Sequence, residues 1–392
     1  MSSNAMRVFA AGVVAITIGI YAETGFSGNS TLPKNDPVTL AVERGVKWLV
    51  SVQGKDGGWG QDGGETSYIR QAEHLESKGN DVANTAVAAA ALLHTGNTPT
   101  SGEYRDALQR AVRFILRHVD ESPAEGLAIT DLQGTQIQRK LGPYIDTFLT
   151  SKLLAELDGA MGDAKANAQV RHSLQKCVAK IEKNQLKDGS WNVAGGWAPI
   201  LGTSMASQSL FKAQQKGVVV SQVAMDKVEQ YAMLSPPPTA GAGSGGGVGS
   251  GVAGGVAGGV VAGSVAMRVS VSSASAGVPL YMHAQELEQL SRTDADRKKN
   301  AGKINAITAQ LADKQFVSGF GSIGGEEFFS YLNISDSLHR TGGPSWEKWD
   351  RDIKTKIVKL QNEDGTWAGQ HCITGRVAVT SAAILTLLAD RE

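Results

Sequence analysis

A short pattern occurs three times in this chain: a helix-like run ends in a glutamine, three residues follow, and then comes Gly-x-Trp. The copies run from Gln53 to Trp59, from Gln185 to Trp191, and from Gln361 to Trp367. Self-similarity of this kind is typical of repeat architectures, in which each unit buries its apolar surface against its neighbours. The pattern therefore constrains the fold more than any single residue does.

Each position of the pattern has a physical interpretation. An Asp-Gly pair, such as Asp56 and Gly57, ends a helix, because glycine adopts the positive φ of a C-terminal turn and aspartate bonds to nearby backbone. The glutamine has a donor and an acceptor on a long side chain, so it can bind backbone groups left unpaired at a helix end. We predict that the tryptophan packs its large apolar face against a neighbouring unit.

The first copy is the fullest, because a basic-Gly pair at Arg44 and a Trp-Leu pair at Trp48 precede Gln53 in register. This arrangement resembles the QW repeat of the squalene–hopene cyclase and protein prenyltransferase superfamily. The resemblance covers about residues 37–392 apart from one insert, and it implies an all-α (α/α)6 toroid of six outer and six inner helices. Segments 141–148, 195–202 and 369–375 are similar to a bacterial group of exported squalene-cyclase-repeat proteins, from which no activity can be carried over.

Helical periodicity in the residues agrees with a toroid. Charged amphipathic segments alternate with segments that are small, apolar and poor in charge, and we expect these to form outer and inner helices respectively. The expected outer helices are residues 37–53, 103–119, 165–185, 217–233, 295–313 and 345–361. The expected inner helices are residues 81–93, 144–157, 199–212, 280–290, 326–338 and 371–388.

Two segments fall outside this alternation, which otherwise predicts one toroid domain over residues 28–392. Residues 236–277 are rich in Gly, Ala, Val and Ser, a composition that cannot repay the entropy of ordering, so we expect a flexible insert. At the N-terminus, Arg7 precedes an apolar run from Val8 to Ala22. Its helix would be about 22 Å long, too short for a bilayer core of about 30 Å, so residues 1–27 are predicted to be a secretory signal or an uncleaved anchor.

Composition narrows the possible partners. Lys plus Arg and Asp plus Glu are equal, at 38 each, so no net charge attracts nucleic acid, and a membrane would be met only through an uncleaved N-terminal segment. The chain is expected to be exported, to a periplasmic or other extracytoplasmic compartment. It has two cysteines, Cys177 and Cys372, which exclude a zinc ribbon or a disulfide scaffold and leave their pairing open. No cofactor is expected.

The resemblance places the site in a central cavity near the N-termini of the inner helices, where helix dipoles also converge. The candidate catalytic residues there are Asp81, Tyr144, Glu326, Glu327 and His371. The candidate ligand-binding residues are Asp146, Trp197, Tyr281, Tyr331, Cys372, Thr374 and Arg376. Capping and core packing are the alternative roles, since Asp and Glu also suit helix N-termini without any ligand.

The catalytic signatures of the superfamily do not match. The Asp-x-Asp-Asp acid motif of class II terpene cyclases has its nearest strings at Asp294 and Asp350, and neither fits. The Asp-Cys-Thr-Ala-Glu motif of oxidosqualene cyclases is missing from the sequence. Prenyltransferases hold zinc with an Asp-x-Cys pair and a later His, whereas here His371 and Cys372 are adjacent. Neither an activity nor a metal site can therefore be transferred by motif.

Three functions remain open. The favoured one is an exported toroid that binds an apolar, isoprenoid-like ligand or a partner without catalysis. A second is a toroid enzyme such as a polysaccharide lyase or hydrolase, in which a carboxylate or a Tyr/His pair transfers protons on a glycan. A third is a divergent terpene cyclase with a relocated acid. The lining of the cavity distinguishes them, since a dry aromatic lining suits a lipid and a polar one suits a glycan.

Overall fold

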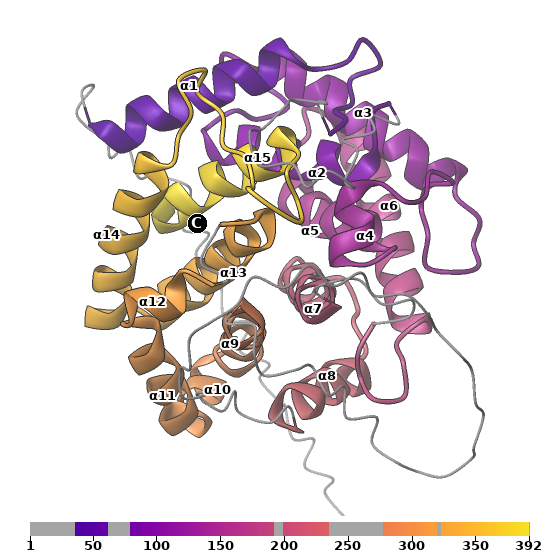
Figure 1. The fold of residues 1–392 in the computed structure, drawn as a ribbon. Helices are drawn as coiled ribbons and strands as arrows, with labels where there is room; N and C mark the ends of the chain where they lie inside the picture. Colours follow the sequence, from indigo (N-terminus) through magenta and orange to yellow (C-terminus); the bar gives the residue numbers. More distant parts are fainter. Residues whose placement is uncertain (1–35, 62–78, 192–198, 235–276, 320–322, 392) are drawn as a thin grey trace, which may run out of the picture.

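The computed structural model describes residues 36–61, 79–191, 199–234, 277–319 and 323–391. These residues form fifteen α-helices and one short 3₁₀-helix, with the helices arranged around a common centre (Figure 1). The all-α toroid expected from the sequence is confirmed. The segment 1–27, the insert up to residue 276, and Trp197 lie outside the described residues.

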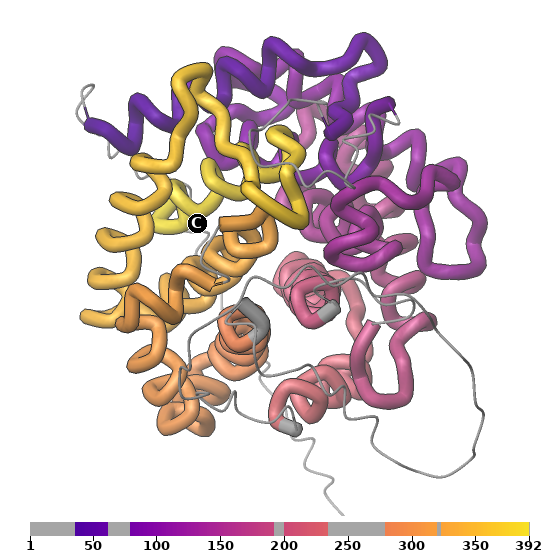
Figure 2. The backbone as a smooth tube through the Cα atoms, viewed as in Figure 1, coloured from indigo at the N-terminus to yellow at the C-terminus, as the bar shows by residue number. Residues whose placement is uncertain are grey.

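Six of the described helices form an inner layer. Each packs against the next in chain order, and the last, α15, returns to the first, α2, so that the layer closes into a ring (Figure 2). Small residues allow this close packing: every residue of α15 after its first is buried, and eight of these eleven are Ala, Val, Ser or Thr. The inner helices are α2 (Val82–His94), α5 (Ile145–Leu157), α7 (Pro199–Gln215), α9 (Gly277–Leu290), α13 (Gly325–Thr341) and α15 (Arg376–Leu387).

A second set of helices lies outside the ring. Their apolar stripes face the inner helices, as in α3, where Leu108, Ile115 and Val119 are buried and charged residues occupy the other face. The outer helices are α1 (Pro37–Ser51), α3 (Arg105–Glu121), α6 (Ala164–Lys183), α8 (Gln222–Leu234), α11 (Ala301–Leu311) and α14 (Gly343–Lys359).

The helices differ from the expected set in three places. The expected helix 217–233 begins only at Gln222, and the expected helix 371–388 begins only at Arg376, so His371, Cys372 and Thr374 lie in the loop before α15. Residues 295–313 were expected as one helix, but they form α10 (Asp294–Lys299) and α11, with Asn300 as the residue between them. Two further short helices were not expected at all. They are α4 (Gln136–Leu141) and α12 (Lys314–Val317), and the chain ends in a short 3₁₀-helix, η1 (Ala389–Arg391).

The glutamines of the repeat join neighbouring outer helices. Gln53, just after α1, donates from Nε2 to the carbonyl of Gly57 in its own turn and to the carbonyl of Ala107 in α3, both at 2.9 Å. Gln185 makes the same two bonds between the ends of α6 and α8. Gln361, after α14, binds the carbonyl of Ala41 in α1 at 2.8 Å. The third copy therefore joins the last outer helix to the first.

The tryptophans of the repeat join the outer layer to the inner one. The indole Nε1 of Trp59 donates to the carbonyl of Leu49 near the end of α1 at 2.7 Å, and its backbone amide donates to Thr85 Oγ1 on α2 at 2.8 Å. Trp191 and Trp367 repeat both bonds. All three rings are buried. Each tryptophan thus ties a carbonyl in the last turn of its outer helix to the first turn of the next inner helix, and the carbonyls of Leu49 and Ile357 also accept a backbone amide.

Glycine is required in the turn that separates the glutamine from the tryptophan of each repeat. Gly189 has φ +90°, and a Cβ at this position would lie 2.2 Å from the carbonyl oxygen of Lys227 on α8. Any side chain would therefore both strain the turn and push the next outer helix away.

We expect Trp59→Ala to lower the free energy of unfolding by about 3 to 5 kcal/mol, because it removes a fully buried indole and its bond to Leu49. Chemical denaturation measures the change. Trp346→Ala is the matched control, since Trp346 is only partly buried on the outer helix α14. Equal losses in the two variants would contradict the role given to Trp59.

Candidate functional site

The N-terminal ends of the inner helices meet at one end of the ring, and α4 lies against them. This short helix packs on α2, α5 and α7. It begins at a capping box made by Thr135 and Gln138 and ends at Gly142, which has φ +114°. Its last residue, Leu141, approaches α7 so closely that a Cβ on Gly202 would lie 2.3 Å from the Leu141 carbonyl oxygen. The helix is therefore fixed over this end of the ring.

Two candidate carboxyl groups, Asp81 and Asp146, meet at the N-terminus of α2; we call them the aspartate pair. Asp81 caps α2, accepting the backbone amide and side-chain amide of Asn84 at 2.8 Å each. Asp146, in the first turn of α5, reaches across to accept the amide of Ala83 at 3.1 Å. Its other oxygen accepts Gln138 Nε2 of α4 at 2.7 Å. One helix N-terminus thus faces two carboxyl groups.

Burial makes the charged forms of both aspartates costly. It raises the pKa of Asp81 from 3.8 to about 6, against the opposing effect of the Asn84 hydrogen bonds. It raises the pKa of Asp146 to about 7, and the neighbouring charge of Asp81 adds to the increase. The pair therefore holds a proton near neutral pH, and its two titrations are coupled.

A second group gathers at the N-terminus of α13: Glu326, Glu327, Tyr281, His371 and Cys372, here called the glutamate cluster. All five side chains are buried. Glu326 Oε2 accepts the amide of Ile373 at 3.2 Å and a hydrogen bond from the Cys372 side chain. Burial raises the pKa of Glu326 above its ordinary value. Glutamate, histidine and cysteine thus lie together although 45 residues separate Glu326 from His371 in the sequence.

Glycines allow the loop that contains His371 and Cys372 to dock on α13. The amide of Gly325 donates to the carbonyl of Ile373 at 3.0 Å. A Cβ on Gly369 would lie 1.9 Å from that same carbonyl oxygen, and a Cβ on Gly324 would lie 2.6 Å from the His371 ring. Side chains at these positions would separate the loop from the helix, so the glycines bring His371 and Cys372 against Glu326.

The backbone at Cys372 is unusual. Among the described residues it is the one non-glycine residue with positive φ, at +59°, a conformation that costs an L-residue roughly 1 to 2 kcal/mol. Strain of this kind is typically retained at functional sites, where the surrounding structure enforces it. Here it turns the chain at Cys372, directly after His371.

The far side of the glutamate cluster contains two tyrosines and a lysine. Tyr281 is hydrogen-bonded to Glu327, and burial together with the Glu327 charge raises its pKa well above the usual range. Tyr331 donates to the carbonyl of Val317 at 2.7 Å and accepts Lys356 Nζ at 2.8 Å. Burial lowers the pKa of Lys356 to about 8, although the Glu327 charge opposes the shift. The Glu327 charge thus acts on Tyr281, Tyr331 and Lys356 alike.

Helix α4 connects the aspartate pair with the glutamate cluster. Gln138 binds Asp146, while Gln136 donates to Thr374 Oγ1 at 2.9 Å and accepts the amides of Thr374 and Gly375 at 3.0 Å each. The Lys140 charge acts on Glu326. None of these three α4 residues was expected from the sequence to belong to the site. The Thr-x-x-Gln capping box at Thr135 was the one local signal that could have revealed the helix.

Two of the remaining candidates have different surroundings. Arg376 pairs with Asp364 at 2.7 Å and lies over the Trp48 ring, 5.1 Å from its centroid, so it joins two copies of the repeat. Tyr144 precedes α5, is partly buried and packs against the hydrophobic core.

One small cavity lies inside the described part of the ring. A cavity of about 30 Å³ lies between α2, α5, α7 and α13, far below the 300 to 1,000 Å³ of typical ligand sites. Charged groups line it. Glu156 pairs with His94 at 2.9 Å and with Lys212 at 2.6 Å, and Lys152 pairs with Asp336 at 3.1 Å. Apolar residues make up most of the lining, however, so the size of this cavity, rather than its polarity, is what argues against an isoprenoid.

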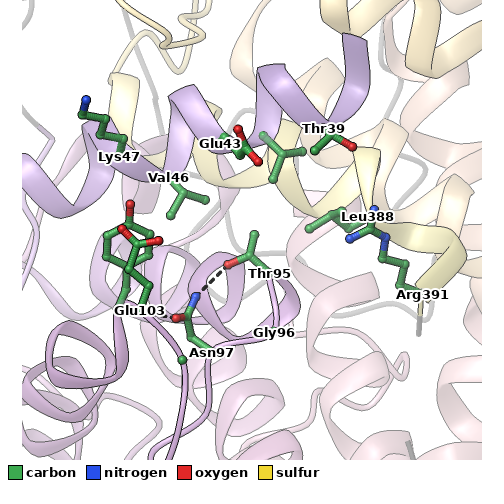
Figure 3. Close-up of a pocket in the computed structure, with 13 residues that line it drawn as sticks. Thr39, Glu43, Val46, Lys47, Thr95, Gly96, Asn97, Glu103, Leu388 and Arg391 are labelled. Carbon is green, nitrogen blue, oxygen red and sulfur yellow. Dashed lines mark hydrogen bonds between the residues drawn. The ribbon is translucent and has the colours of Figure 1, made fainter. Parts of the chain in front are cut away.

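A larger groove of about 560 Å³ lies at the opposite ends of the inner helices, where α2 and α15 end (Figure 3). Glu43 and Lys47 of α1 lie along one side of the groove, and Arg391 lies near Leu388 at the end away from Lys47. A hydrogen bond of 3.0 Å from Asn97 Nδ2 to Thr95 Oγ1 shapes the floor. None of the sequence-predicted site residues lines this groove.

Comparison with known proteins identifies the class of fold. Residues 28–126 match the family model of the squalene-hopene cyclase C-terminal domain. This part contains α1, α2, α3 and the first copy of the repeat. Comparisons with curated proteins and with solved structures gave no match. The family match supports the squalene-cyclase and prenyltransferase-like toroid superfamily for this chain, in agreement with its ring of helices.

We expect the stability of the protein to fall as the pH rises from about 4 to about 7. In this range an unfolded aspartate has already released its proton, whereas Asp81 keeps its proton up to about pH 6 and Asp146 up to about pH 7. Asp81→Asn should reduce this slope by about 1 kcal/mol per pH unit. Denaturant unfolding at several pH values measures it.

Asp81→Asn is a mild substitution, because the Oδ1 of Asn84 has no hydrogen-bond partner and its amide can turn to accept the new donor. The control is Asp163→Asn, which changes an exposed aspartate that caps α6 in the same way. The same slope in the wild type and in Asp81→Asn would contradict the assignment.

Proposed function

We propose that this squalene-cyclase-like toroid catalyses proton transfer on a polar substrate at the end of the ring where the inner helices begin. The observation that carries the proposal is the aspartate pair. Asp81 and Asp146 lie on adjacent inner helices, face one helix N-terminus, and hold a proton near neutral pH. A group that must both give and take protons works best when its pKa lies near the working pH.

The surroundings of the pair support this role. Gln138 and the amide of Ala83 hold the Asp146 carboxyl in one orientation, and the Oδ1 of Asn84, a buried acceptor without a partner, lies in the same group. Buried polar atoms are nearly always paired in native proteins, so an unpaired one beside a titratable carboxyl favours a bound ligand that donates a hydrogen bond. Hydroxyl groups of a glycan are donors of this kind.

An isoprenoid-like ligand in a central cavity, the function favoured by the sequence, has less support. The cavity between the inner helices has a volume of about 30 Å³, and its lining is mostly apolar with His94, Lys152 and Glu156 among it. A C30 chain needs hundreds of Å³ of apolar space, as ligand sites in general do. We therefore place the substrate at the end of the ring where the inner helices begin. The test below also detects a polyprenyl substrate.

The test is solvent-deuterium incorporation. Incubation of the protein in D₂O with glycan and lipid fractions of the cell envelope should give a deuterium-labelled product from the glycan fraction, detected by mass spectrometry. Asp81→Asn and Asp146→Asn should each lower its formation by roughly 10² to 10⁴-fold, while Asp163→Asn leaves it unchanged. Full labelling with both variants would refute the role of the pair. Labelling of the lipid fraction alone would show that the substrate is a lipid and not a glycan.

We also propose that the chain is exported. The support is the run from Val8 to Ala22 behind Arg7, which has the length and order of a secretory signal. In the described part of the chain, no helix is long and apolar enough to cross a membrane.

Export predicts that the protein is recovered outside the cytoplasm, and that replacing Ile16 and Ile18 by aspartate retains it inside, because charges disrupt the apolar run. Cell fractionation followed by N-terminal sequencing measures both location and cleavage. Cytoplasmic recovery of the unchanged full chain would reject the proposal.

A further inference from the structure

We infer that Glu326, His371 and Cys372 form a binding site for a divalent transition metal, with zinc as the best fit. The ligand atoms of these three buried residues all lie within 4.8 Å of one another. Among the described residues, no other group of three histidine, cysteine or acidic side chains comes together in this way. This site is separate from the aspartate pair and does not depend on the function proposed for that pair.

The geometry is close to that of a bound metal. Zinc lies about 2.0 to 2.3 Å from nitrogen, oxygen and sulfur ligands, so the donors of a tetrahedral site are separated by about 3.3 to 3.8 Å. Reaching this geometry from separations of up to 4.8 Å requires side-chain movements of about 1 Å. Three protein ligands also leave one tetrahedral position for water or substrate, as in catalytic zinc sites.

The backbone favours convergence of neighbouring ligands. Consecutive side chains of an extended chain point to opposite sides, so two adjacent residues rarely bind one ion. The positive φ of Cys372, +59°, turns the chain at this point. The His371 and Cys372 donors consequently lie within reach of Glu326 rather than on opposite sides of the loop.

The supporting contacts hold the site in place. Glu326 is fixed by the amide of Ile373, and the missing side chain at Gly324 makes room for the His371 ring. Such supporting contacts normally orient metal ligands. The donor set of one nitrogen, one sulfur and one carboxylate oxygen suits zinc or cobalt and is poorly matched to magnesium or calcium, which bind oxygen alone.

Titration of the full chain with Co²⁺ tests the site directly, because a cobalt–thiolate bond gives a charge-transfer absorption that needs no knowledge of the reaction. We expect one equivalent to bind with this absorption, with at least one proton released to the buffer as the thiol becomes a thiolate. Zinc should displace the cobalt and abolish the absorption.

Three variants complete the experiment. Cys372→Ser should remove the charge-transfer absorption and weaken zinc binding at least about 100-fold, more than losing a supporting contact normally costs. Glu326→Gln should weaken binding and keep the absorption. Cys177→Ser is the control, because it removes the other buried free thiol and should change neither. Circular dichroism confirms that each variant is folded.

Two results would overturn the inference. One is the absence of stoichiometric cobalt or zinc binding to the folded wild-type chain. The other is a cobalt–thiolate absorption that survives Cys372→Ser and is lost in Cys177→Ser, which would place the metal elsewhere. If Cys372→Ser does not fold, the test rests on Glu326→Gln. Wild-type affinity for the metal in folded Glu326→Gln would then contradict the inference.

Discussion

The bond from each repeat tryptophan to the end of its outer helix is the constraint on which the rest of the structure depends. An outer helix leaves carbonyl groups unpaired at its C-terminus, and burying them without partners would be costly. The indole N–H binds a carbonyl of the last helical turn at 2.7 Å in all three copies, while the tryptophan amide binds a threonine on the next inner helix. The turn between helices is thereby fixed in both layers.

Closing the ring has a consequence for chemistry. With Gln361 joining α14 to α1, the six inner helices begin at the same end, and their partial positive charges converge there. Acidic side chains are stabilised at that end, which explains why Asp81, Asp146, Glu326 and Glu327 gather there. Deep burial works against their negative charge and raises the pKa of Asp81, Asp146 and Glu326. Residues of the kind that cap helices therefore keep their protons to a higher pH than exposed carboxyl groups do.

Much of the fold could be predicted from the sequence because its determinants are local. The Asp-Gly turns, the Gln and Trp spacing, and the alternation of charged and small apolar segments each lie within a few residues. The boundary at Asn300 was missed, because α10 and α11 together keep the charge pattern of one helix. The short helix α4 has too few residues to show a period.

The site could be predicted only as a set of candidates, since its contacts join distant residues. The sequence places Asp146 and Glu326 at helix N-termini, but it does not show that α4 binds Asp146 and brings the Lys140 charge near Glu326, or that Gln136 binds Thr374 across 238 residues. The sequence suggested Arg376 as a ligand-binding residue because it follows His371 and Cys372 closely. In the fold its side chain instead contacts Asp364 and Trp48. The sequence also showed no metal motif, because the carboxylate near His371 and Cys372 comes from another helix.

The central claim is that the end of the ring where the inner helices begin holds a proton on buried carboxyl groups near neutral pH. Infrared spectroscopy of protein labelled with ¹³C-aspartate tests it directly, because a protonated carboxyl absorbs apart from a carboxylate. The account predicts a protonated aspartate band at pH 5.5 that titrates away with midpoints near 6 to 7 and is lost or shifted in Asp81→Asn. A folded wild-type protein whose aspartates are all ionised at pH 5.5 would contradict it.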